Sequence, residues 1–227
     1  MLHELLRLFR PGNPLSVMAE EFAEMLRIAC DMTITAGKLF FGDSVAPDDA
    51  ATIYRQDVRV NKLERSVRKQ VVAHLSVSGN TPNLPYCLAL LNLVKDVERI
   101  GDYAKNLSEV CEIRSGPLPD DEIVGELREI RAGVERAFLA TGEILAESDG
   151  ERALELIRLG KDHAQRADRL LLRIAQSSYD AATTAALVLG VRYYKRFGGH
   201  LLNVLSSVVM PLHKIDYYDE TEILGPG

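Results

Sequence analysis

Apolar residues recur at intervals of three and four along most of this chain, and no segment shows sustained alternation. This is the spacing of residues that share one face of a helix. Clusters of glycine, proline and short polar residues interrupt the pattern and mark the helix ends. The pattern predicts an all-α protein without β-strands. The six predicted helices cover residues 15–40, 47–77, 84–113, 119–147, 150–177 and 180–213.

The third and sixth predicted helices carry similar apolar stripes. The first stripe is Leu90, Val94, Val97, Gly101, Ala104, Ser108 and Cys111, and the second is Leu187, Val191, Tyr194, Gly198, Leu201, Leu205 and Val208. They align at a constant separation of 97 residues, which pairs Gly101 with Gly198 and Asn106 with Asn203. Glycine costs about 1 kcal/mol in a helix interior relative to alanine, so we expect a close backbone neighbour at the repeated glycine. The alignment predicts a duplication into two tandem three-helix bundles with a pseudo-two-fold internal repeat.

The strongest break, at Ser115–Asp121, divides the chain into these repeats. We expect a first three-helix repeat with a short N-terminal segment in residues 1–116, a second repeat in 117–213 and a flexible tail in 214–227. Residues 1–10 (MLHELLRLFR) are charged throughout and too short for the apolar core of a secretory signal. They form either a docked first turn or a small amphipathic contact with a membrane or a partner. We expect at most peripheral contact with a membrane.

Composition narrows the class of protein. The 227 residues carry 27 Lys and Arg against 33 Asp and Glu, a formal net charge of −6, with no basic stripe of the kind that binds nucleic acid. The three cysteines lack CxxC spacing and are expected to be buried thiols in a reducing, cytoplasmic compartment. No glycine-rich phosphate loop or hydrolase motif is present, so we expect a protein that is not an enzyme.

The third predicted helix carries a pair of acidic residues. Glu98 and Asp102 are four apart and therefore lie on one face, one turn from each other. Like charges at this spacing repel, and a hard cation bound by carboxylate oxygens would cancel the repulsion. The alternative is a solvated acidic flank that is neutralised by Lys95, Arg99 and Lys105.

The second predicted helix offers a matching set of oxygen ligands. Asp57 and Asn61 are again four apart, and Glu64 follows three residues later. If the second and third helices pack antiparallel, their two acidic faces converge. The alternative is an ordinary exposed face with local ion pairs, each worth a few tenths of a kcal/mol.

These two segments resemble motifs of a known family. Residues 93–106 (LVKDVERIGDYAKN) resemble the third-helix motif of the PhoU family, usually written LERIGDHAxNI. Residues 57–64 (DVRVNKLE) resemble the acidic second-helix motif of the same family. The two-repeat, six-helix layout extends the resemblance to about residues 15–213.

The resemblance implies a cytoplasmic regulator of phosphate homeostasis. Members of the family act with the phosphate ABC transporter and a membrane sensor histidine kinase in signal transduction that represses phosphate-starvation genes. Some carry iron or zinc clusters on the outer faces of the bundles, bound by E/DxxxD motifs. Carried over, the metal-binding residues are Asp57, Asn61, Glu98 and Asp102, with Asn61 where an acid or amide is usual. A homodimer is left open.

The second repeat departs from the family pattern. Lys195 stands where Glu98 does in the first repeat, and Gly199 stands where Asp102 does. A charged ammonium group cannot bind a metal, and glycine has no side chain. We therefore expect a metal cluster on the first repeat only. The alternative is a rebuilt site with other ligands, namely Asp162, His163, Asp168 and His200.

Two other functions are kept as alternatives. One is a metal-binding or metal-storage helical protein, although di-metal bundles use inward-facing Glu and ExxH pairs and no ExxH occurs here. The other is a regulator of a different anion transporter, for which the altered second repeat and the acidic tail leave room.

Overall fold

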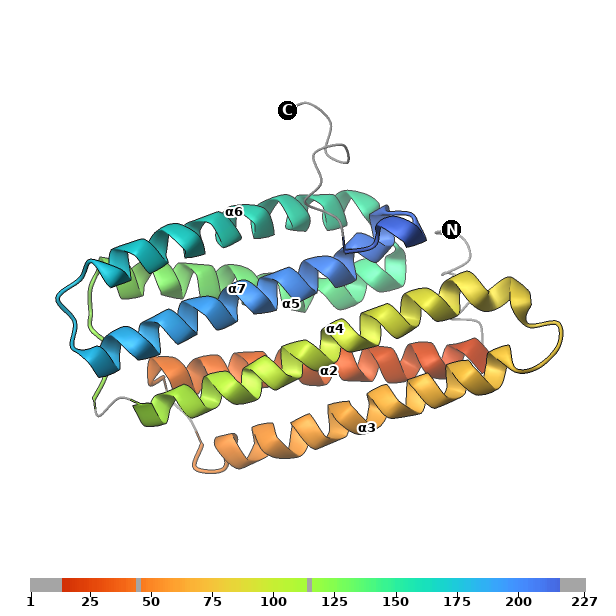
Figure 1. Ribbon diagram of the computed structural model, residues 1–227, viewed down its shortest axis with the longest axis horizontal. Helices are drawn as coiled ribbons and strands as arrows, with labels where there is room; N and C mark the ends of the chain where they lie inside the picture. The colour runs from red at the N-terminus through yellow and green to blue at the C-terminus, as the bar shows by residue number, and fades with distance from the viewer. Residues whose placement is uncertain (1–13, 44–45, 114–115, 217–227) are drawn as a thin grey trace.

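The computed structural model describes residues 14–43, 46–113 and 116–216, and these residues form six long α-helices and no strand (Figure 1). The predicted all-α class is confirmed. The expectations for residues 1–10 and for the tail beyond residue 216 lie outside the described ranges. The helices are α2 (Pro14–Phe41), α3 (Asp49–Leu75), α4 (Leu84–Glu109), α5 (Glu122–Glu147), α6 (Gly150–Ala175) and α7 (Ala181–Val209). Short 3-10 helices follow α4 at Val110–Ile113 and α7 at Leu212–Lys214.

The observed helix ends have local causes. The last helix ends at Val209, four residues before the predicted end, because Met210 is extended (φ −110°, ψ 150°) ahead of Pro211. A residue before proline is disfavoured in the helical region. At the other end of the second repeat, α5 begins at Glu122 because the carboxylate of Asp121 accepts hydrogen bonds from the backbone N–H groups of Ile123 and Val124.

The helices form two three-helix bundles that lie side by side (Figure 1). In the first bundle α2, α3 and α4 each pack against the other two, and α5, α6 and α7 do the same in the second. The bundles meet mainly where α4 packs against α7, with a smaller contact between α2 and α5. The predicted pair of tandem bundles is therefore present, while the exact domain boundaries stay a prediction.

The two predicted stripes are buried, and the glycine of each faces its own bundle, Gly101 toward Met32 and Val60 and Gly198 toward Val134. The seam between the bundles is the contact of α4 with α7. Val94, Val97 and Ala104 of α4 are fully buried, as are Leu187, Val191 and Tyr194 of α7. Cys30 and Cys87 are buried thiols as expected, whereas Cys111 is only half-buried. None of the described helices is long and apolar enough to cross a membrane.

The expectation that another part of the backbone lies close to the repeated glycines, Gly101 and Gly198, is wrong. A Cβ added at Gly101 would lie 3.7 Å from Met32 and Val60, and one at Gly198 would lie 3.9 Å from Val134, which is ordinary contact. Close approach occurs at other glycines. A Cβ at Gly190 would lie 2.4 Å from the ring of Phe40, so this glycine makes room for a large side chain from the other bundle.

Candidate functional site: the acidic face of the first repeat

The helices α3 and α4 run antiparallel, joined by residues 76–83, and bring their acidic residues together as predicted. The ammonium group of Lys105 links them. Its Nζ lies 3.3 Å from Oδ2 of Asp57 on α3 and 3.2 Å from Oδ1 of Asp102 on α4. The side chains of Lys105 and Asp57 are only 23% and 14% exposed, so this cross-helix ion pair is largely shielded from water.

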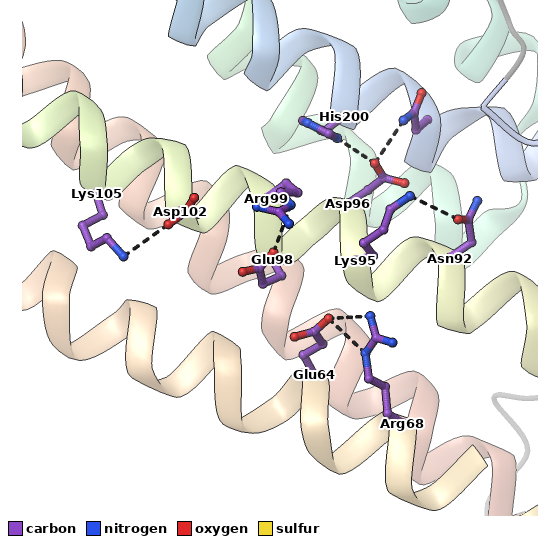
Figure 2. A network of polar contacts seen from close by, with 11 residues as sticks. Glu64, Arg68, Asn92, Lys95, Asp96, Glu98, Arg99, Asp102, Lys105 and His200 are labelled. Atoms are coloured by element: carbon purple, nitrogen blue, oxygen red, sulfur yellow. Dashed lines mark hydrogen bonds and ion pairs between the residues drawn. The ribbon is translucent and has the colours of Figure 1, made fainter. Parts of the chain in front are cut away.

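Five polar residues of these two helices lie near one another, and we call them the α3–α4 acidic face: Asp57, Asn61, Glu64, Glu98 and Asp102. Asn61 donates a hydrogen bond from Nδ2 to Oδ2 of Asp57 at 3.4 Å. Figure 2 shows Glu98 and Glu64 projecting into the space between α4 and α3. Each is paired on its own helix, Glu98 with Arg99 at 3.6 Å and Glu64 with Arg68 at 2.7 Å.

The surroundings of Glu98 disfavour its ionised form. Burial raises the pKa of Glu98, and the negative charges of Glu64, Asp102 and Asp57 raise it further, while Arg99 opposes them. Partial burial lowers the pKa of Lys105, but the hydrogen bond to Asp102 and the negative charge of Asp57 outweigh this effect. The pKa of Lys105 is therefore raised, which favours its charged form. The face therefore stabilises positive charge and penalises further negative charge.

The donors of the α3–α4 acidic face have the chemistry of a hard-cation site, since carboxylate and amide oxygens are what such cations prefer. Their arrangement does not match a preformed site: within the described residues no group of three or more His, Cys, Asp or Glu side chains is placed to hold a metal ion. Lys105 supplies positive charge between Asp57 and Asp102 instead. The metal predicted at Asp57, Asn61, Glu98 and Asp102 stays a prediction.

The equivalent face of the second repeat is closed by an ion pair. The Nζ of Lys195 on α7 lies 2.5 Å and 2.6 Å from the two carboxylate oxygens of Asp168 on α6. The second and third helices of this bundle thus meet through a polar contact, as in the first. Here one lysine and one carboxylate neutralise each other, and the face retains no surplus of acid.

The four residues considered for a rebuilt site have different surroundings. The ring of His163 lies over Gly133, where an added Cβ would be 2.1 Å away, and burial lowers the pKa of this histidine. Asp168 pairs with Lys195, and His200 points to the other bundle, where its Nδ1 lies 2.6 Å from Oδ1 of Asp96. Nothing in the described part of the chain gathers them around a common centre.

Asp96 is a polar residue of the seam that the sequence pattern did not single out. Its side chain is 1% exposed, and its Oδ1 accepts a hydrogen bond from His200 (Figure 2). The same oxygen accepts a second hydrogen bond from Nδ2 of Asn203 at 3.0 Å. The signal that was available is its place beside Val97, at the edge of the buried stripe of α4. Asp96 and its two partners on α7 tie the bundles to each other with directional contacts.

Comparison with known proteins finds similarity to the PhoU domain and to PhoU proteins. Residues 22–111 match the model of the PhoU domain, and this range contains α3, α4 and the whole acidic face. The chain is 23% identical over 167 residues to phosphate-specific transport system accessory protein PhoU homolog 1 of Thermotoga maritima, covering 70% of this chain and 71% of the relative. It is 34% identical over 62 residues to phosphate-specific transport system accessory protein PhoU of Serratia marcescens, covering 27% and 25%.

The solved structures agree on the fold. The crystal structure of PhoU from Pseudomonas aeruginosa superposes with a TM-score of 0.76 at 18% identity, covering 88% of this chain and 97% of that one. The phosphate transport system regulatory protein PhoU from Streptococcus pneumoniae gives 0.72 at 11% identity, covering 93% and 97%. The resemblance to the PhoU family and the all-α, six-helix fold are confirmed.

Proposed function

We propose that this chain, which carries a PhoU domain and has the PhoU fold, is a regulatory accessory protein of phosphate transport. The observation that carries the proposal is the α3–α4 acidic face, built by the ERIGD helix and its partner inside the matched domain. The two relatives support it, since both are accessory proteins of phosphate-specific transport systems.

The finer proposal is that the chain works in the cytoplasm with a phosphate ABC transporter and a sensor histidine kinase. It would bind them through the surfaces of its helices and carry out no chemistry on them. A face whose charges are fixed across two helices suits this role, because complementary charge selects a partner and orients it. A homodimer is compatible with the same role.

Iron or zinc on the first repeat is a further part of the proposal. The residues that would hold it are Asp57, Asn61, Glu98 and Asp102, and the metal would supply positive charge that draws the two helices together. Lys105 would have to withdraw from Asp57 and Asp102 for these oxygens to turn to a metal. Asp168 and Lys195 leave no equivalent role in the second repeat.

Elemental analysis tests the metal separately from the regulation. Elemental analysis of the purified chain should give stoichiometric iron or zinc that is lost in the Glu98→Ala/Asp102→Ala double variant. The Lys195→Met variant is the matched control in the other repeat and should keep its metal. Metal content that is equal in the wild type and the double variant would exclude the first-repeat site.

The regulatory role is tested in the host cell. Deletion of the gene should release phosphate-starvation genes from repression, and the wild-type chain should restore repression on complementation. Affinity capture should retrieve the phosphate transporter with the wild-type chain and less of it with Glu98→Arg, which reverses a charge on the acidic face. Retrieval of another anion transporter, with phosphate genes unchanged, would contradict the proposal and favour a regulator of that transporter.

A further inference from the structure

The outer side of α3 carries an exposed row of basic and apolar residues. This helix packs against α2 and α4 and lies at one edge of the molecule (Figure 1). The row consists of five exposed residues at intervals of four and three, which we call the α3 outer row: Val58, Lys62, Arg65, Lys69 and Val72. This spacing keeps the side chains in one line along the helix. From residue 58 to residue 72 the row is about 21 Å long at the rise of an α-helix.

The three cations of this row are not neutralised by the bundle. Lys62, Arg65 and Lys69 form no ion pair and no side-chain hydrogen bond with any residue that the structure describes. The remaining arginines of α3 do have carboxylate partners: Arg55 with Asp48, Arg59 with Glu24 and Arg68 with Glu64. In a chain with a formal net charge of −6, the row is therefore a local positive region.

Both ends of the α3 outer row are apolar. Val58 is 50% exposed and Val72 is 65% exposed, and each lies one helical turn beyond the nearest cation of the row. A single exposed valine is ordinary on a protein surface. Two of them at the ends of a row of unpaired cations give the row a charged centre between two apolar contacts.

The equivalent helix of the second repeat, α6, does not carry this row. The two helices turn equivalent faces to their bundles, as three pairs of buried residues 107 positions apart show: Val60 and Ala167, Leu63 and Leu170, Val67 and Ile174. At the same separation, the positions from Val58 to Lys69 correspond to Gln165, Arg169, Leu172 and Gln176, which are also exposed. These four residues carry one cation. The charge of the row is therefore specific to α3 and is not a consequence of the fold.

The spacing and the charges of the row describe the element that fits it. Side chains that repeat every four and three residues along one helix interlock with the same repeat on a second helix. Cations that become buried in an interface are costly unless carboxylates pair with them. The positions that face the three cations must therefore be acidic, and those that face the two valines must be apolar.

Other occupants fit the row less well. Asp57 precedes Val58 and Glu64 precedes Arg65, so both carboxylates lie about 100° round the same helix, where a wide anionic membrane surface would also approach them. Helices that lie on membranes present Trp, Phe or Leu rather than valine. Nucleic-acid backbones engage more cations than three. A second copy would have to offer its α3–α4 acidic face, where Lys105 already binds two carboxylates.

We propose that the α3 outer row docks an acidic amphipathic helix of a partner protein. Carboxylates of that helix pair with Lys62, Arg65 and Lys69, and apolar side chains at its two ends pack against Val58 and Val72. The inference goes beyond the proposed function and does not depend on the acidic face, on the metal or on phosphate regulation.

Site-specific photo-crosslinking in the host cell tests this docking. The full chain carries p-benzoylphenylalanine in place of Val72 or, as the matched control, in place of Leu172 on α6, which has nearly the same exposure. Mass spectrometry of the crosslinked peptides should join position 72 to a helical segment with three acidic residues at intervals of four and three. Adding Arg65→Glu should lower the yield of this crosslink about ten-fold or more, because like charges then face each other. Adding Arg169→Glu, the corresponding charge reversal on α6, should leave the yield unchanged.

Four results would overturn the inference. A yield at position 72 no greater than at position 172 would show that nothing docks on the row. A crosslink to a segment without acidic residues, or one that Arg65→Glu leaves intact, would contradict the role of charge. A crosslink to the chain's own peptides, together with a doubled mass in light scattering, would assign the row to a second copy. A crosslink to lipid alone would assign it to a membrane surface.

The outcome is separable from that of the proposed function. An acidic helix of a protein unrelated to phosphate would support the docking and contradict the regulatory role. Loss of repression on deletion of the gene, without a crosslink from position 72, would support the regulatory role and contradict the docking.

Discussion

The two repeats present the same helical face with different charges. In the first repeat the face between α3 and α4 carries Asp57, Glu64, Glu98 and Asp102, and Lys105 bridges only two of them. In the second repeat the face between α6 and α7 is held by one pair, Lys195 and Asp168. The backbone scaffold is shared, so the difference is one of side-chain charge. It shows that a duplicated fold can keep an acidic face in one copy and neutralise it in the other.

The two faces also differ in the burial of their charges, which affects how much each ion pair contributes to stability. The carboxylate of Asp57 is 14% exposed and that of Asp168 is 54% exposed. A charge pair that is shielded from water is costly to break because the remaining charge is left without solvent, whereas an exposed pair contributes little. The two lysines should therefore differ in their effect on stability although both bridge neighbouring helices.

The largest expected effect on stability is at a position where the two repeats carry side chains of different size. Gly190 of α7 stands where Leu93 stands in α4, and the ring of Phe40 fills the space that it leaves. The Gly190→Ala variant should lose about 2–3 kcal/mol of unfolding free energy, because Phe40 is fully buried and cannot move aside. Urea unfolding checks this. The control is Gly101→Ala, which should gain up to about 1 kcal/mol from helix propensity, and a loss there would show that the close approach first expected does exist.

The second prediction concerns the two lysines that pair with carboxylates on the neighbouring helix, one in each repeat. Lys105→Met should cost about 2 kcal/mol at neutral pH, because Asp57 and Asp102 lose their shared partner. Lys195→Met should cost less than about 1 kcal/mol, because Asp168 stays hydrated. Chemical unfolding of both variants gives the comparison. Equal losses would mean that the two faces are energetically alike.

The third prediction concerns helix capping, which differs between the repeats. Asp149 caps α6 by accepting a hydrogen bond from the backbone N–H of Arg152, whereas Asp48 makes no such bond at the start of α3. Asp149→Ala should lower the unfolding free energy by about 1 kcal/mol. Asp48→Ala should shift the midpoint of urea unfolding by less, because it removes only an exposed ion pair with Arg55. A shift as large as that of Asp149→Ala would argue for a cap at Asp48 as well.

The smallest effect is a pH dependence. The folded state raises the pKa of Glu98, whose ordinary value is 4.5, so the folded chain binds the proton more tightly than the unfolded chain does. Glu98 therefore favours the folded state most below its ordinary pKa, and this contribution is lost as pH rises through the raised value. The Glu98→Gln variant should improve relative to wild type by less than about 1 kcal/mol between about pH 3 and pH 7. Urea unfolding at both pH values measures this, and a relative decline would show that the face favours ionised Glu98.

Much of the candidate site was predictable because it depends on helical spacing. The four-residue intervals of Asp57 and Asn61 and of Glu98 and Asp102 follow from the helix period, and antiparallel packing of consecutive helices made their faces meet. The sequence also named Lys105 as one of several neutralising residues. Only the structure shows that it reaches Asp57 across the helix pair, which Lys95 and Arg99 do not.

The sequence by itself determined the helices, their duplication and the buried stripes of α4 and α7, because these follow from local periodicity and breakers. Tertiary structure decided which side chains of the two bundles meet. It placed His200 and Asn203 on the buried carboxylate of Asp96, and Phe40 over Gly190. Those contacts join residues about 100 or more positions apart, and side-chain packing between two bundles depends on shape and distance that no periodic pattern encodes.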